Sequence, residues 1–94
     1  MNEIELKWAT ADGGKKFITT EGINMDIEID ENNKEIKNAK AFFREIIYMS
    51  FLNDTYKKIV LVDDTDNELS EVKTIINELI HVCNDELEAR STAD

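Results

Sequence analysis

Residues 58–62 of this chain read Lys58-Ile59-Val60-Leu61-Val62, with four consecutive apolar side chains. A strand with one face in water would place a polar residue at every second position, and this run does not. Lysines before the run and aspartates after it limit its length. We therefore expect a short strand in the middle of a sheet, buried on both faces.

The first twenty residues predict a hairpin. Residues 3–8 alternate between charged and apolar side chains, as a strand with one wet face does. Residues 12–14, Asp-Gly-Gly, supply the positive φ angles of a tight reversal, so residues 15–20 should return antiparallel. Two inward-facing pairs remain open for this second strand: Phe17 with Thr19, or Ile18 with Thr20.

Residues 23–30 predict a third strand, with isoleucines and a methionine on one face and an acidic ladder on the other. Carboxylates two residues apart on a strand lie roughly 6.5–7 Å apart and repel each other without a nearby cation. The acidic face is either a solvated outer surface or a binding surface for positive charge. For such a surface we predict Asp26, Glu28 and Asp30, together with Glu3 and Glu5 of the first strand.

Residues 33–53 change to helical spacing of their apolar side chains. Asn32 and Glu35 form an Asn variant of a capping box at the expected start of this helix. Its second half is apolar nearly all round, which is more than covering one sheet face requires. Either a second helix packs there or the surface is an oligomer contact. The residues predicted for that contact are Phe42, Tyr48 and Phe51.

The acidic segment after residue 62 allows a calcium loop or a helix cap. Asp64, Asp66 and Glu68 alternate like calcium ligands, but the loop lacks its glycine and its final glutamate. Thr65 with Glu68 fits a capping box better, so we expect no metal there. A second helix should cover residues 66–88, with apolar side chains at heptad spacing. Residues 90–94 are expected to be a frayed polar tail.

The element order is therefore strand, strand, strand, helix, strand, helix. The first helix is long enough for a right-handed crossover, so the strand at 58–62 should run parallel to the third or the first strand. We predict one α+β domain over residues 1–94, a two-layer sandwich. Its mixed four-stranded sheet should carry both helices on one face.

The charge composition limits the classes of partner that can be expected. The chain has 21 acidic and 11 basic side chains, for a net charge of −10. Direct binding to nucleic acid or to an anionic membrane is not expected, because the lysines are scattered among acids, and a basic protein is the better partner. No apolar run approaches the ~18 residues of a membrane span. One cysteine and no secretory signal favour the cytoplasm.

Catalytic patterns are missing from the sequence. His81 and Cys83 are two positions apart on one helix and cannot form a pair, although His81 can contact Asp85. No phosphate loop, dinucleotide fingerprint or paired-cysteine motif occurs. We therefore expect neither an enzyme nor a cofactor.

Two function classes follow from the sequence. The first is a small acidic inhibitor or immunity-type protein, a nucleic-acid mimic that binds a basic site on a partner. The absence of proline and the free use of Ile, Asn and Lys are typical of low-GC bacterial and phage genes. The alternative is a structural or assembly component, a homo-oligomer that associates through the apolar face of the first helix.

Overall fold

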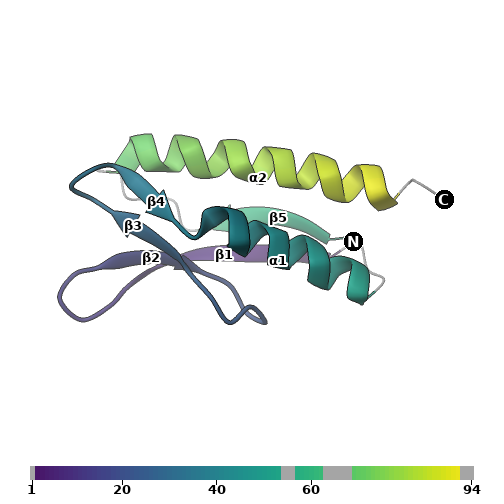
Figure 1. Cartoon of the computed structure of the whole chain (residues 1–94), viewed down its shortest axis with the longest axis horizontal. Helices are drawn as coiled ribbons and strands as arrows, with labels where there is room; N and C mark the ends of the chain where they lie inside the picture. Colours follow the sequence, from purple (N-terminus) through teal and green to yellow (C-terminus); the bar gives the residue numbers. More distant parts are fainter. Residues whose placement is uncertain (1, 54–56, 63–68, 92–94) are drawn as a thin grey trace.

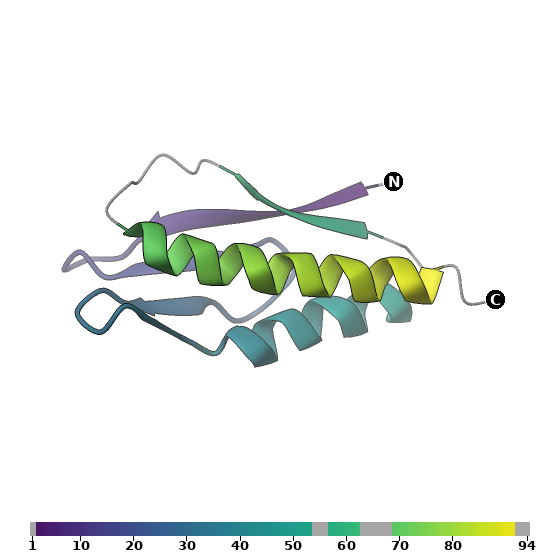
Figure 2. The same ribbon diagram turned by 90° about the horizontal axis from the view of Figure 1, so that it is seen from above.

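The computed structural model describes residues 2–53, 57–62 and 69–91. In chain order its elements are β1 (Asn2–Thr10), β2 (Lys16–Thr19), β3 (Ile27–Asp30), β4 (Glu35–Lys37), α1 (Ala39–Leu52), β5 (Lys57–Val62) and α2 (Ser70–Ser91). The two helices lie beside each other and both cover the same side of a curled sheet (Figure 1; Figure 2).

The five strands form one sheet in the order β4-β3-β2-β1-β5. Consecutive strands from β1 to β4 pair antiparallel, whereas β5 pairs parallel with β1 and places Leu61 opposite Leu6. The parallel pair arises because α1 carries the chain from β4 at one edge of the sheet to β5 at the other. The predicted α+β class and mixed sheet are confirmed, but the predicted count of four strands is wrong.

The strand at 58–62 lies at an edge of the sheet, so its predicted central place is wrong. Ile59 is buried in the core, whereas Val60 and Val62 are only half-buried on the outer face, where Val60 lies opposite Glu5. Among the described residues, no element covers that outer face. The unbroken apolar run reflects the strand preference of valine on a pleated surface rather than two covered faces.

The predicted β1–β2 hairpin is confirmed. Gly13 and Gly14 have φ angles of 87° and 83°, and the Ala11 N–H donates to the Lys15 carbonyl at 2.8 Å. The inward-facing pair of the second strand is Ile18 and Thr20, which are both buried. The Thr20 hydroxyl donates to the Glu5 carbonyl oxygen at 2.8 Å, so this buried polar group is satisfied.

A second hairpin stands where the sequence predicts the start of the first helix. Residues 35–37 form β4, and α1 begins only at Ala39, after Asn38 in the left-handed region at φ 70°. The predicted cap between Asn32 and Glu35 is therefore wrong. The reason lies in Asp30, whose carboxylate accepts the backbone N–H groups of Asn32 and Asn33 at 3.1 and 3.2 Å. This Asx-type turn reverses the chain before a helix can start.

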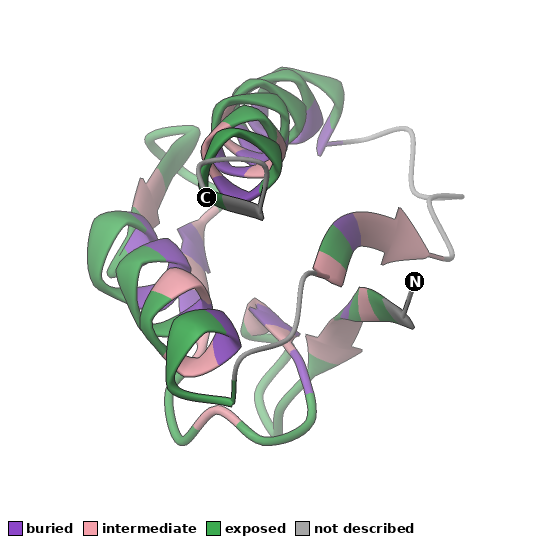
Figure 3. Ribbon diagram, turned by 90° about the vertical axis from the view of Figure 1, so that its right-hand side faces the viewer, coloured by how far each residue is buried: buried purple, intermediate pink, exposed green. Residues whose placement is uncertain are grey.

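One cluster of buried residues joins the inner face of the sheet to both helices, and Figure 3 shows buried segments on the helices and on the strands. Phe42 packs edge-on against Phe43, with ring centroids 5.5 Å apart. α2 continues through Ser91, past the position at which the polar tail is predicted to begin. The cap predicted between Thr65 and Glu68, and the acidic residues of the calcium-loop alternative, Asp64, Asp66 and Glu68, lie outside the described residues.

Candidate functional site

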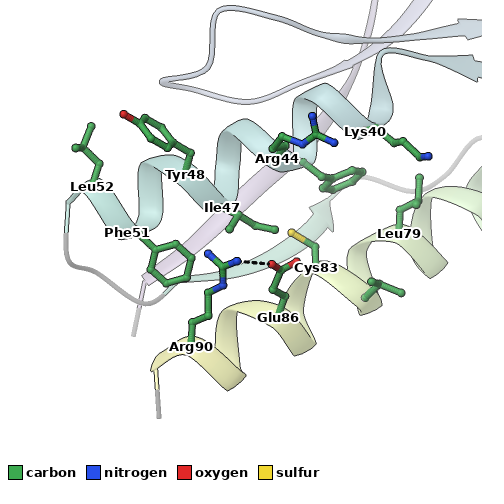
Figure 4. A pocket seen from close by; sticks show the side chains of 12 residues that line it. Lys40, Arg44, Ile47, Tyr48, Phe51, Leu52, Leu79, Cys83, Glu86 and Arg90 are labelled. Carbon is green, nitrogen blue, oxygen red and sulfur yellow. Dashed lines mark ion pairs between the residues drawn. The ribbon is translucent and has the colours of Figure 1, made fainter. Parts of the chain in front are cut away.

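An apolar groove of about 860 Å³ runs between α1 and α2, on the solvent side of the helix pair (Figure 4). Ile47 and Cys83 point into it from opposite helices, and Phe51 faces Arg90 at one end. The groove is partly open to solvent, as a trough between two surface helices is. Its lining residues are Lys40, Phe43, Arg44, Ile47, Tyr48, Phe51, Leu52, Leu79, Val82, Cys83, Glu86 and Arg90.

Large apolar side chains on the rim of this groove are exposed. Tyr48 is 57 % exposed, and Leu52 on α1 and Val82 on α2 are each 63 % exposed. They are exposed because the core takes only one face of α1, the face of Phe42 and Ile46. The surplus of apolar residues on this helix therefore lines a groove instead of being buried against α2. Such a contiguous patch is typical of an interaction surface.

The three predicted oligomer-contact residues separate into two groups. Phe42 is 0 % exposed in the core, so the prediction that it contacts another subunit is wrong. Tyr48 and Phe51 both line the groove. The contribution of α2 is not evident from the sequence pattern, because Leu79 and Cys83 fit its core-facing stripe and Val82 stands as an isolated apolar residue.

Charged side chains are distributed unevenly along the groove. Lys40 and Arg44 lie near the first turns of α1, and Glu86 and Arg90 near the end of α2. Arg90 Nη2 donates to Glu86 Oε1 at 3.0 Å, and its guanidinium carbon lies 4.7 Å from the ring centroid of Phe51. Arg90 therefore closes one end of the groove through a paired charge and a ring contact.

Cys83 lines the groove as an apolar group. Burial, and to a smaller extent the charge of Glu86, raises the pKa of its thiol to about 12. The thiol is protonated at neutral pH, and only the thiolate is a competent nucleophile. The groove therefore offers a surface for binding rather than a nucleophile.

The predicted acidic surface is divided between two places on the outer face of the sheet. Across the sheet, Glu28 of β3 lies beside Phe17 of β2, which lies beside Ala9 of β1. Glu5 comes four residues before Ala9, which is about 13 Å along β1. The structure therefore does not bring Glu3 and Glu5 together with the carboxylates of β3.

Cations from neighbouring elements compensate the acidic ladder, although its own strand has none. Lys15 Nζ lies 3.3 Å from Glu28 Oε1, and Lys37 of β4 is the cross-strand neighbour of Glu28. Asp26 is half-buried just before β3 begins. The expectation of uncompensated repulsion is therefore wrong, because it considered one strand in isolation.

Asp30 has a structural role in the β3–β4 turn. Hydrogen bonds from Asn33, first from its side-chain amide and then from its backbone N–H, lower the pKa of Asp30, and Lys37 adds to the effect. The amide donates to Asp30 Oδ2 at 2.9 Å. Both carboxylate oxygens are therefore engaged within the turn.

Other candidate sites are simpler. His81 and Asp85 form the predicted contact on the surface of α2, with Nε2 and Oδ2 3.5 Å apart. Among residues 2–53, 57–62 and 69–91, no group of three His, Cys, Asp or Glu side chains is placed to hold a metal ion. No described helix combines the length and the apolarity that crossing a membrane requires.

Comparison with family models, curated proteins and solved structures finds no match to this chain.

Proposed function

We propose that this protein is a small, acidic, non-enzymatic binding module that holds a helix of a partner protein in the groove between α1 and α2. The observation that carries the proposal is the exposure of Tyr48, Leu52 and Val82 around an apolar trough. Aromatic side chains such as Tyr48 are enriched at the centres of protein interfaces, and burying apolar side chains releases water from their surface.

The dimensions of the groove suit a helix. From Lys40 to Leu52 the lining of α1 spans twelve residue steps, which is about 18 Å of helix. A partner helix of three to four turns would match this length and pack against both walls at the usual interaxial distance of about 8–10 Å. Recognition would then follow the helix-in-groove mode, with apolar anchors spaced three and four residues apart.

A test is to place a photo-crosslinking amino acid at Leu52 in one preparation and at Met25 in another. Met25 is a partly exposed apolar residue outside the groove, so it serves as a matched control. We expect position 52 alone to crosslink a partner, and the purified partner to lose binding to the variant Tyr48→Ser/Leu52→Ser. Crosslinking of the protein to itself at position 52, or equal crosslinking from both positions, would contradict the proposal.

A second candidate function is favoured by the net charge of −10 and by the outward-facing carboxylates of Glu3 and Glu5. In this role the protein is an inhibitor or immunity-type protein, encoded by a phage or mobile element, that mimics nucleic acid toward a basic partner. Charge of this sign accelerates association with a basic surface. The free, buried Cys83 suits the reducing cytoplasm for either function.

A further inference from the structure

The groove has the opposite sign of charge from the chain as a whole. The protein carries 21 acidic against 11 basic side chains, yet the charged residues of the groove are Lys40, Arg44 and Arg90 against Glu86 alone. Arg90 is paired with Glu86. The excess positive charge therefore belongs to Lys40 and Arg44, which lie four residues apart on one face of α1.

Lys40 and Arg44 have no ion-pair partner within the described part of the chain. Lys40 is in the first turn of α1, which contains no acidic residue and has no side-chain cap. The amino end of a helix is the positive end of its dipole, so a cation is unfavourable there. α2 has the favourable arrangement, with Glu71 in its first turn and Arg90 in its last.

From this charge pattern we infer the chemistry of the groove's occupant, an inference that rests on the proposed function. The occupant is an amphipathic helix of a different protein that carries carboxylates at one end. Its apolar side chains pack against Ile47 and Phe51, and its carboxylates lie over Lys40 and Arg44. There they meet two cations and the positive end of the α1 dipole together.

A second copy of this chain fits the groove less well. Docking groove to groove would bring the groove cations of both copies into one interface, and it would join two chains of net charge −10. A small anionic amphiphile has matching chemistry, but sites for such ligands enclose most of the ligand surface, whereas this trough is open.

The test uses two designed fourteen-residue peptides with the same apolar helical face. One has glutamates at one end and the other has lysines at the same end, and both are titrated by fluorescence anisotropy at low salt. We expect the acidic peptide to bind wild type about tenfold more tightly, as two or three exposed ion pairs would allow. The variant Lys40→Glu/Arg44→Glu should reverse this preference.

The control variant is Lys7→Glu/Lys58→Glu, which makes the same change in net charge on the outer face of the sheet. It should keep the preference of wild type for the acidic peptide. Misfolding would not explain a reversal, because Lys40→Glu places a favourable charge in the first turn of α1. An equal effect of both variants, or equal binding of both peptides, would overturn the acidic occupant while leaving helix docking intact.

Two further outcomes also decide the inference. If neither peptide binds, the acidic helix is excluded, while the crosslinking experiment at Leu52 still tests the proposed function independently. If oleate binds with an affinity that the Lys40→Glu/Arg44→Glu variant abolishes, and displaces the acidic peptide, the groove belongs to an anionic amphiphile and the helical occupant is wrong.

Discussion

The side-chain amide of Asn84 on α2 pairs with the backbone of Ile59 on β5. Its Oδ1 accepts the Ile59 N–H at 2.8 Å, and its Nδ2 donates to the Ile59 carbonyl at 3.0 Å. β5 is an edge strand, and a free edge exposes backbone groups to another chain. Asn84 therefore takes the place of a neighbouring strand at one residue and fixes α2 against the sheet.

Replacing Asn84 with alanine should remove both hydrogen bonds and leave two partly buried backbone groups without protein partners. We expect a loss of about 1–3 kcal/mol in the free energy of unfolding, measured by urea denaturation. Asn77→Ala, at an exposed position of the same helix, is the matched control and should change stability by less than about 0.5 kcal/mol. Alanine is the better helix former, so helix propensity alone would stabilise both variants, and equal losses would mean that the amide pair is not their source.

Ile59 and Val60 provide a test of the edge position of β5. Ile59 is 1 % exposed, so Ile59→Lys should cost more than about 4 kcal/mol or abolish folding. Val60 lies on the open face opposite Glu5, so Val60→Lys should cost less than about 1 kcal/mol and can form a cross-strand ion pair. Thermal melting followed by circular dichroism distinguishes the two. A Val60→Lys variant that fails to fold would mean that something covers the outer face.

The sequence correctly predicts those elements in which the spacing of the apolar residues matches the side that is buried. β1 and α2 each have one buried side and one wet side, so period and burial agree, and the Asp-Gly-Gly turn is set locally by its two glycines at positive φ. Residues 33–38 were assigned wrongly because their apolar spacing fits either element, with Ile36 opposite Ile29 across the sheet. The Asp30 carboxylate decides between them through contacts that periodicity does not encode.

The groove was only partly predictable. The excess of aromatic residues on α1 correctly indicated an exposed apolar surface at Tyr48 and Phe51. It wrongly included Phe42, which is buried in the core, because helical spacing alone does not say which of several apolar stripes meets the sheet. The partnership of Lys40 with Arg44 as an uncompensated pair depends on the placement of α2, which the sequence leaves open.

Cys83 should be nearly inert while the protein is folded. The pKa of its thiol rises from 9.0 to about 12 because of burial, so the thiolate fraction at pH 8 falls about a thousandfold. Alkylation by iodoacetamide should be correspondingly slow in buffer and fast in denaturant. The raised pKa also means that this group favours the folded state fully below pH 9 and progressively less as the pH rises toward 12. Rapid alkylation of folded protein would contradict the burial.

Asp30 should make stability depend on pH in the acid range. Its pKa in the folded protein is lowered below 3.8 by Asn33, so its contribution is present above that pH and is lost as the pH falls through the lower folded value. Asp30→Asn should therefore flatten the decline of melting temperature below pH 4. Asp12→Asn, in the other hairpin turn, controls for the loss of one carboxylate. An identical acid decline in wild type and Asp30→Asn would exclude the turn as its source.

The two candidate functions use different surfaces, and each surface should control a different rate constant of partner binding. Charges at the rim of an interface act mainly on association, whereas buried apolar anchors act mainly on dissociation. The variant Glu3→Gln/Glu5→Gln/Asp26→Asn neutralises outward carboxylates, and the fold should tolerate it because all three lie on the outer face or beside it.

We expect the partner captured at Leu52 to dissociate at least about tenfold faster from Tyr48→Ser/Leu52→Ser, as the loss of two apolar anchors implies. Its association rate should change little in the carboxylate variant. Surface plasmon resonance at two salt concentrations measures both rates. The opposite result would be slower association for the carboxylate variant, a steep fall of the wild-type association rate with salt, and no effect of the groove variant on dissociation. That result would assign binding to the outer face of the sheet, and the exposure of Tyr48 and Leu52 in the groove would then need another explanation.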